Sequence, residues 1–386
     1  MYTRTLSVPN HSFFLFGPRS TGKTTWLKQT LPAEGTTTFD FLLDDVLIPL
    51  LQQRELFRQR VEASNPGWIF IDEVQKFPAV LNDVHHLIQK YPDKRYKFAI
   101  SSSSARKLKR LDSNLLAGRV IKRDFFPLTI KEIGANFDLD TALQFGMLPK
   151  VVSDPEFAID ILEAYTGTYV TQEINQETLI RDIATFARFL RIAAIMNSEI
   201  LNVSNIARDA AIGRTTAQRY FEILVDTLIG WFVYPWQSKI KVKEVAHPKF
   251  YLFDPGVARS LSGYLREPVG REESGALLET LVLHELRAWS CYTNSGGDIF
   301  YWRTTAGKEV DFIWSRGATT IGIEVKSSKN WRREWSKPLL ELLAAKRITK
   351  AFGIYRGTEI LKEGALTILP VEEFATRLYQ NLFELA

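Results

Sequence analysis

The sequence lacks several features, and each absence excludes a class of protein. Cys291 is the single cysteine among 386 residues, so no disulfide can form within the chain, as is typical of a reducing cytoplasm. No apolar run reaches the ~20 residues that a membrane-spanning helix needs. The first residues, MYTRTLSVPNHS, lack the apolar core of a signal peptide. We therefore expect a cytoplasmic protein with no membrane partner.

Clusters of histidine and cysteine are also missing, because the five histidines are scattered apart from His85 and His86. This argues against a zinc site. Charge is nearly balanced, with 49 basic and 44 acidic residues and a net charge of +5, so a nucleic-acid partner is permitted but not required. A hydrophobic content of 45% over this length is enough for two or three packed domains.

Near the N-terminus, the stretch GPRSTGKTT fits the template of a phosphate-binding loop. Its glycines let successive backbone N–H groups point at phosphate oxygens. Lys23 is expected to contact the β- and γ-phosphates of ATP, and the Thr24 hydroxyl to bind Mg²⁺. The flanking residues predict a strand before the loop and a helix after it, whose N-terminus favours an anion. The residues expected to bind ATP here are Gly17, Pro18, Arg19, Ser20, Thr21, Gly22, Lys23, Thr24 and Thr25.

A second stretch, GWIFIDEVQKFP, predicts a buried strand that ends in two acidic residues. Asp72 is expected to hold Mg²⁺, and Glu73 to polarise the water that attacks the γ-phosphate. A later strand ends in four serines, of which Ser103 is the candidate for contacting ATP; the alternative is a serine turn that caps the next helix. Strands that alternate with helices predict a parallel sheet, with nucleotide bound beyond the carboxyl ends of the strands.

Four stretches together resemble one lineage of AAA+-type ATPases from bacteria and archaea: GPRSTGKTT, IFIDEVQKFP, FAISSSSARKL and LLAGRVIKRDFFPLTIKEI. The resemblance implies an ATPase core over residues 1–135. It also implies a catalytic role for Arg119 as an arginine finger, within its own subunit or from a neighbouring subunit of a homo-oligomer. The alternative is a surface arginine, and Arg106 is a weaker candidate. The family commonly has Thr-Gly-Ser where this sequence has Ser101-Ser102-Ser103, a mild departure.

Residues 136–250 are predicted to form a helical lid and a winged helix-turn-helix. Two predicted helices are separated at Gly213, and a strand is predicted after Gly230. The second helix is expected to bury Ala217, Tyr220, Phe221, Leu224 and Leu228. It is also expected to begin with residues able to touch DNA, namely Arg214, Thr215, Thr216, Gln218 and Arg219. The alternative is a winged helix that docks protein.

Residues 251–386 resemble the domain of unknown function that follows this ATPase core, beginning at about KFYLFDPGVARSL. A helix with Glu279, a strand with Asp311 and a strand with Glu324 and Lys326 also resemble the PD-(D/E)xK nuclease fold. The three carboxylates are expected to bind Mg²⁺, with Glu324 and Lys326 as catalytic residues at a phosphodiester. The alternative is a nuclease-like fold that only binds. Nearby, KNWRREWSK either contacts nucleic acid or packs its tryptophans inward.

The sequence thus predicts an α/β protein with an N-terminal parallel-sheet P-loop ATPase, a helical and winged-helix middle and a C-terminal α/β nuclease-like domain. Its cofactors are ATP and Mg²⁺. The predicted function is ATP hydrolysis coupled to a domain that binds DNA or another nucleic acid and, if the nuclease-like site is active, cleaves it. The alternative is a nucleotide-gated switch or scaffold whose inactive nuclease-like domain binds protein or DNA.

Overall fold

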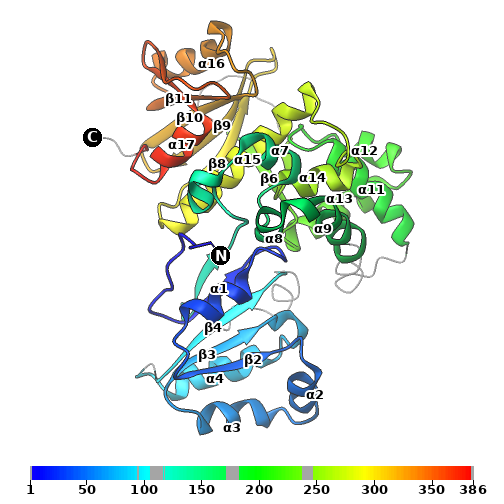
Figure 1. Cartoon of the computed structure of the whole chain (residues 1–386), viewed down its shortest axis with the longest axis vertical. Helices are drawn as coiled ribbons and strands as arrows, with labels where there is room; N and C mark the ends of the chain where they lie inside the picture. Colours follow the sequence, from blue (N-terminus) through cyan, green and yellow to red (C-terminus); the bar gives the residue numbers. More distant parts are fainter. Residues whose placement is uncertain are drawn as a thin grey trace. The chain divides into compact units, whose positions relative to one another are not determined.

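The computed structural model describes residues 2–93, 95–104, 116, 118–170, 182–236 and 247–383 (Figure 1). The chain divides into two compact units. The N-terminal unit is Arg4–Pro127 with Asp226–Ile229, and the C-terminal unit is Met1–Thr3, Leu128–Val225 and Gly230–Ala386. The three predicted domains, with boundaries near residues 135 and 250, remain a prediction.

The N-terminal unit is built on a parallel sheet, in which the described strands follow the order β2-β3-β4-β1-β5. The strands are β1 (Phe13–Phe16), β2 (Thr36–Asp40), β3 (Gly67–Asp72), β4 (Tyr96–Ser102) and β5 (Ile121–Asp124). The helices are α1 (Lys23–Thr30), α2 (Asp44–Gln52), α3 (Glu55–Ala63) and α4 (Val80–Lys90). Because all of the described strands are parallel, the carboxyl ends of β1, β3 and β4 lie at the same end of the sheet, as predicted.

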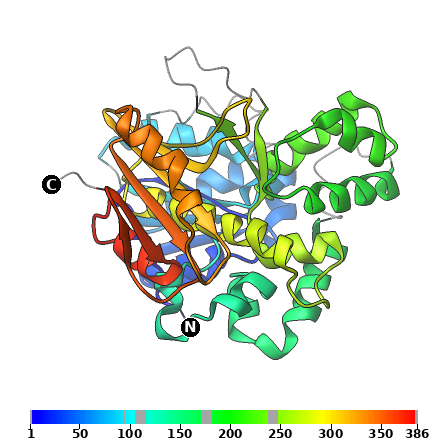
Figure 2. The ribbon, with the colours of Figure 1, turned by 90° about the horizontal axis from the view of Figure 1, so that it is seen from above.

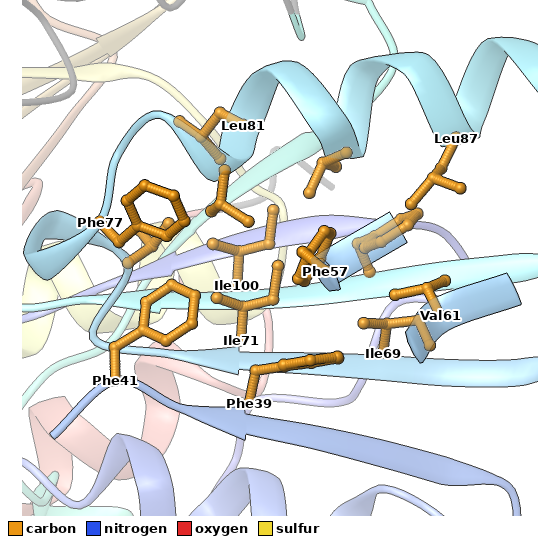
Figure 3. Packing of buried hydrophobic residues seen from close by; sticks show 14 of the residues in the cluster. Phe39, Phe41, Phe57, Val61, Ile69, Ile71, Phe77, Leu81, Leu87 and Ile100 are labelled. Atoms are coloured by element: carbon orange, nitrogen blue, oxygen red, sulfur yellow. The ribbon is translucent and has the colours of Figure 1, made fainter. Parts of the chain in front are cut away.

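One face of this sheet packs against α3 and α4 (Figure 3). Ile69, Ile71 and Ile100 point from the strands toward Leu81 and Leu87 of α4. Burying an aliphatic side chain of this size contributes about 1.5–3 kcal/mol relative to leaving it exposed. This core fixes the positions of β3 and β4, whose carboxyl ends carry the acidic and serine residues.

The C-terminal unit begins with a series of helices. They are α6 (Ile130–Ile133), α7 (Leu139–Phe145), α8 (Pro149–Ser153), α9 (Ala158–Ala164), α11 (Ile183–Ile195), α12 (Val203–Asp209), α13 (Arg214–Asp226) and α14 (Pro255–Ser262). The green helices α11, α12 and α13 lie together on one side of the unit (Figure 2). α13 buries Ala217, Tyr220, Phe221 and Leu224, as its spacing predicts, but it ends at Asp226, so the predicted Leu228 lies beyond the helix, with a φ of 63°.

A mixed sheet dominates the C-terminal unit, and its described strands follow the order β12-β13-β11-β10-β9-β8-β6-β7. They are β6 (Gly230–Pro235), β7 (Lys249–Leu252), β8 (Asp298–Arg303), β9 (Glu309–Arg316), β10 (Thr319–Lys326), β11 (Lys350–Tyr355), β12 (Leu361–Glu363) and β13 (Leu366–Pro370). β9 is antiparallel to β10, whereas β11 is parallel to it. The sheet includes β6 and β7, so it continues across the predicted boundary near residue 250.

Three helices cover this sheet: α15 (Arg271–Tyr292), α16 (Arg333–Ala344) and α17 (Val371–Leu378). α16 packs on one face, where Leu339 and Ile313 belong to one cluster of buried side chains (Figure 1). Phe352 faces the other side, where Phe383 stacks on it and also contacts Phe374 of α17. α15 packs against β10 and α17, so its Glu279 lies close to the sheet.

Candidate functional sites

The phosphate-binding loop joins β1 to α1, and two of its glycines are sterically required. A Cβ on Gly17 would lie 2.2 Å from the carbonyl oxygen of Phe125, so no larger residue fits without a shift of the backbone. Gly22 precedes α1 with a φ of 90°, which favours glycine. Thr24 and Thr25 follow in the first turn of α1, where backbone N–H groups have no partner within the helix. The loop therefore has the backbone shape that its sequence predicts.

Lys23 is buried beneath this loop. Its Nζ donates to the carbonyl oxygens of Gly17 and Pro18 at 2.8 and 3.0 Å. The Thr21 hydroxyl also donates to Pro18, at 2.8 Å. The predicted phosphate-binding lysine therefore lies inside the curl of the loop, where a bound phosphate would compete with these carbonyls for its ammonium group.

Asp72 ends β3 and is fully buried. The Thr24 hydroxyl donates to its Oδ2 at 2.7 Å, and Ser101 donates to its Oδ1. Burial raises the pKa of the Asp72 carboxyl. A divalent cation beside Asp72 and Thr24 would offset this cost, since both residues offer the oxygen ligands that Mg²⁺ prefers. These two predicted Mg²⁺ residues are in direct contact, and their donor set fits the ion.

Glu73 follows Asp72 with a φ of 56°, a left-handed conformation that is unusual for a residue with a side chain. Its Oε2 accepts hydrogen bonds from Ser103, at 3.0 Å, and from Gln75. Gln75 in turn contacts Ser103 and Ser102 at 2.8 Å each. Ser103 thus holds Glu73, whereas its predicted contact with ATP stays a prediction.

Sequence reasoning missed two residues around this site. Gln75 lies two positions after Glu73, and no motif letter marks it. Arg4 donates to the carbonyl oxygen of Thr21 at 2.9 Å and to that of Phe126 at 2.6 Å. Its guanidinium also lies 4.1 Å from the centre of the Phe125 ring. Arg4 therefore supports the loop from outside the motif, and its place in the sequence carries no signal for this.

Arg119 lies where the strands of the sheet begin, whereas the phosphate-binding loop lies where they end. It precedes β5, and Ile121 pairs with Phe13 at the start of β1, whereas Asp124 pairs with Phe16 at its end. The length of β5, about 13 Å at 3.3 Å per residue, separates Arg119 from the loop edge. This placement disfavours an arginine finger within the same subunit. A role from a neighbouring subunit stays a prediction, and Arg106 lies outside the described residues.

The C-terminal unit contains the second predicted site. Phe312 on β9 pairs with Ile323 on β10, so the next residues, Asp311 and Glu324, lie opposite each other. Lys326 Nζ lies 2.5 Å from Glu324 Oε1 and 3.6 Å from Asp311 Oδ2. Asp311 Oδ2 also accepts from the backbone N–H of Val325 at 2.7 Å. The structure therefore brings these three predicted residues into contact, and the fourth, Glu279, is close enough for the charges of Asp311 and Lys326 to act on its pKa.

The ionisation of this group reflects its burial. Burial and the charge of Asp311 raise the pKa of Glu324 well above its ordinary value. Burial by itself would lower the pKa of Lys326, but the charges of Asp311 and Glu324 outweigh it and raise that pKa. Lys326 therefore stays an ammonium ion, and it is bound to the carboxylates instead of being free to activate water.

Glu279, the fourth predicted residue, lies on α15 with partners that the sequence did not reveal. It accepts from the Tyr251 hydroxyl at 2.8 Å, and Lys249 Nζ lies 3.4 Å from the same oxygen. Lys249 Nζ also lies 2.5 Å from Glu309 Oε1. Burial raises the pKa of Glu279 to about 7.

The Mg²⁺ site predicted at Glu279, Asp311 and Glu324 stays a prediction. Across the described residues, no group of three or more His, Cys, Asp or Glu side chains is arranged to hold a metal ion. The sequence placed Lys326 beside these carboxylates, but it gave no sign of Lys249. Lys249 lies on β7, 62 positions before Asp311 in the numbering, so no local pattern links them.

Two further surfaces were predicted to contact nucleic acid. On α13, Arg214, Thr215, Gln218 and Arg219 are exposed and Thr216 is half-buried, so this face is accessible. In the segment KNWRREWSK, Trp331 donates to Ser336 at 3.0 Å and packs against the backbone at Gly353. The Trp331 ring is therefore used for packing within the domain.

Comparison with known protein families divides the chain into three matched segments. Residues 9–134 match a model described as an AAA domain. Residues 136–267 and 274–374 match models described as domains of unknown function, DUF8612 and DUF4143. The AAA domain implies a nucleotide-binding domain that binds ATP, typically with Mg²⁺, and suggests ATP hydrolysis. The other two models assign no function to the C-terminal unit.

The relatives of this chain are themselves uncharacterized. Protein Rv2008c of Mycobacterium tuberculosis is 26% identical over 338 residues, which cover 86% of this chain and 74% of the relative. Protein MJ1544 of Methanocaldococcus jannaschii is 23% identical over 335 residues, which cover 79% of this chain and 72% of the relative.

Solved structures are similar only at a low level. The Aeropyrum pernix ORC2 protein in its ADPNP–ADP complexes has a TM-score of 0.36 and 12% identity, covering 66% of this chain and 87% of that chain. The Thermotoga maritima RuvB Holliday junction branch migration motor has a TM-score of 0.30 and 16% identity, covering 57% and 81%. Likeness at this level supports no inference about function. Within the described residues, no helix is both long and apolar enough to cross a membrane.

Proposed function

We propose that the protein is a Mg²⁺-dependent ATPase whose nucleotide state changes how its C-terminal unit binds a partner. One observation carries the first part. Thr24 donates to Asp72 at 2.7 Å, while the adjacent Glu73 accepts hydrogen bonds from Ser103 and Gln75. A phosphate-binding loop and an acidic strand end in contact are what phosphoryl transfer to water requires.

Each residue has a distinct role in this proposal. Lys23 exchanges its carbonyl partners for the β- and γ-phosphates, and the N–H groups of the loop and of α1 bind the remaining oxygens. Thr24 and Asp72 would hold Mg²⁺, which supplies positive charge to the phosphates when bound. Glu73 orients the attacking water and accepts its proton, while Ser103 and Gln75 fix the position of the Glu73 carboxylate.

The test is steady-state ATP hydrolysis by the full chain. Lys23→Ala should abolish turnover, because it removes the charge that binds the transferring phosphate. Lys28→Ala is the matched control, since Lys28 is an exposed lysine on the same helix. Turnover retained by Lys23→Ala would contradict the proposal, and equal losses in both variants would indicate a general defect of α1.

The second candidate function is nucleic-acid binding by the C-terminal unit. The exposed face of α13 supports it, because Arg214, Gln218 and Arg219 begin a helix that follows α12 at a turn. This order is typical of a DNA-reading helix. The lysine-bound carboxylates favour binding without metal-dependent cleavage, which agrees with the alternative of an inactive nuclease-like fold. ATP would then gate binding, and a protein partner is the competing outcome.

This candidate is tested by binding and by cleavage. DNA and RNA, single- and double-stranded, are incubated with the protein and Mg²⁺ or Mn²⁺, with and without ATP. We expect binding without cleavage, and loss of binding in Arg214→Ala/Arg219→Ala but not in Lys326→Ala. Cleavage that Lys326→Ala abolishes would contradict the non-cleaving assignment. Absence of binding to every substrate would favour a protein partner.

A further inference from the structure

The acidic cluster of the C-terminal unit contains four carboxylates, from Glu279, Glu309, Asp311 and Glu324. They come from α15, β9 and β10, which are far apart in the sequence. Asp311 and Glu324 are almost completely buried. A group of this kind is costly unless cations or protons neutralise it. What supplies the positive charge therefore decides what the site can do.

Lys249 is the cation at one end of the cluster. Its ammonium group lies 2.5 Å from Glu309 and 3.4 Å from Glu279. The side chain is only 5% exposed, and it also lies 5.7 Å from the centre of the Tyr301 ring. Strand β7 holds the residue in place, since Lys249 pairs with Val233 on one side and with Ile200 on the other.

The remaining charges are met by two further basic residues. Lys326 is paired with Glu324 and Asp311, and Arg303 Nη1 lies 3.1 Å from Glu309 Oε2. In the part of the chain that the structure describes, four carboxylates thus face three cationic side chains. Among the described residues, Glu324 Oε2 is buried without a hydrogen-bond partner, so one carboxylate charge is left uncompensated at this position. A divalent cation would bring more positive charge than the cluster can balance.

We propose that the Lys249 ammonium group supplies the positive charge that a metal ion would otherwise supply to this cluster. The cluster then keeps its structure, and any binding function, without a metal ion. The inference concerns the domain of the second candidate function and is independent of ATP hydrolysis. It explains why acidic residues in a nuclease-like order do not form a metal group. It also predicts that removal of the ammonium group converts the cluster into a metal-binding site.

The experiment measures Mn²⁺ binding to the nucleotide-free full chain by electron paramagnetic resonance of the free ion. The proteins are the wild type, Lys249→Met, Lys249→Arg, Asp311→Asn and Lys249→Met/Asp311→Asn. We expect no Asp311-dependent ion in the wild type or in Lys249→Arg, which keeps the charge. Lys249→Met should gain one ion, and the double variant should lose it. Asp311→Asn shows how much Mn²⁺ binds elsewhere, including at the ATP site.

Loss of a buried ion pair can destabilise the domain, so thermal unfolding is followed with and without Mn²⁺. Mn²⁺ should raise the Tm of Lys249→Met and leave that of the wild type unchanged. If Lys249→Met does not fold, Lys249→Gln replaces it. An Asp311-dependent ion in the wild type would overturn the proposal, and so would a folded Lys249 variant that takes up no ion. Neither result bears on ATP turnover, which is measured separately with Lys23→Ala.

Discussion

The two units bury acidic side chains in different ways. In the N-terminal unit, Asp72 and Glu73 accept hydrogen bonds from neutral groups, namely serine and threonine hydroxyls and the amide of Gln75. In the C-terminal unit, Glu279, Asp311 and Glu324 are met by the ammonium groups of Lys249 and Lys326. A neutral donor orients a carboxylate and leaves its charge in place, whereas a lysine cancels that charge.

This difference shows that the number of acidic residues does not decide whether a site takes a metal ion. A cation binds where carboxylate charge is uncompensated and oxygen ligands are already aligned, which is what we propose for Thr24 and Asp72. The same residue types become a structural ion-pair group when lysines fold against them. The predictions below separate the two situations, beginning with the largest expected effect.

The strongest test of the N-terminal site is Glu73→Gln. The amide keeps the size of the side chain and can still bond Ser103, but it cannot accept a proton from water. ATP turnover should fall by about 10²–10⁴-fold, while binding of a fluorescent ATP analogue persists. Glu62→Gln is the control, because Glu62 is a surface carboxylate paired with Lys90 at 2.6 Å. Hydrolysis by Glu73→Gln at the wild-type rate would remove Glu73 from the mechanism.

A smaller loss is expected from Gln75→Ala, which removes the amide that holds Glu73 and Ser103. Misplacement of a catalytic group by about 1 Å costs roughly 10²-fold. Because Gln75 positions Glu73 and does not bind ATP in our proposal, kcat should fall while KM stays unchanged. Gln89→Ala, at an exposed position on α4, is the matched control. An increase in KM with unchanged kcat would point to a role in binding ATP instead.

In the C-terminal cluster, Tyr251→Phe removes the hydroxyl that donates to Glu279 at 2.8 Å. A buried acceptor that loses its donor costs about 1–3 kcal/mol of unfolding free energy, measured by urea denaturation. ATP turnover by the folded variant should be unchanged, which is the opposite of the pattern for Glu73→Gln. Tyr264→Phe is the control, since that side chain is 48% exposed. Equal stability of the two variants would show that Tyr251 does not support the cluster.

Glu285 extends the comparison to a buried carboxyl whose described contacts include no lysine or arginine. Its Oε1 accepts from the backbone N–H of Ile130 at 2.8 Å, and burial raises its pKa to about 8. The folded state therefore keeps a proton that the unfolded chain loses above the ordinary value of 4.5. Stability should fall with rising pH between these two values, by up to ~1.4 kcal/mol per pH unit.

Glu285→Gln keeps an acceptor for Ile130 and removes the ionisation. Its advantage in unfolding free energy over the wild type should grow as the pH rises from about 5 to about 8, measured by urea denaturation at several pH values. Glu272→Gln, at an exposed position on the same helix, should follow the wild-type curve. Parallel curves for Glu285→Gln and the wild type would mean that Glu285 ionises normally in the folded protein.

Much of the N-terminal site was predictable because its chemistry is local. The phosphate-binding loop needs glycines and a lysine within nine consecutive residues, Gly17 to Thr25. The acidic pair marks the end of its own strand. Parallel strands then bring these segments to one edge of the sheet whatever the loops between them contain. Ser103 lies at this end of the sheet for the same reason, but its contact with Glu73 was not predicted, and its predicted contact with ATP stays a prediction.

The rest depends on contacts between segments that no sequence pattern connects. Gln75 and Arg4 act through side-chain and backbone contacts that only the folded chain creates. Arg119 was assigned from a motif. Only the pairing of β5 with β1 showed that it lies at the end of the sheet away from the phosphate-binding loop.

By itself, the sequence determined the α/β class, the phosphate-binding loop and the candidates Asp72, Glu73, Glu279, Asp311, Glu324 and Lys326, but not Lys249, Glu309 or Arg4. The tertiary structure alone decided what each carboxylate contacts. In the N-terminal unit, neighbouring strands supply neutral hydroxyls to Asp72 and Glu73. In the C-terminal unit, β7 brings Lys249 to Glu279 and Glu309. The physical reason is that the charge of a buried group must be balanced by whatever lies within a few ångströms, and long-range folding selects those neighbours.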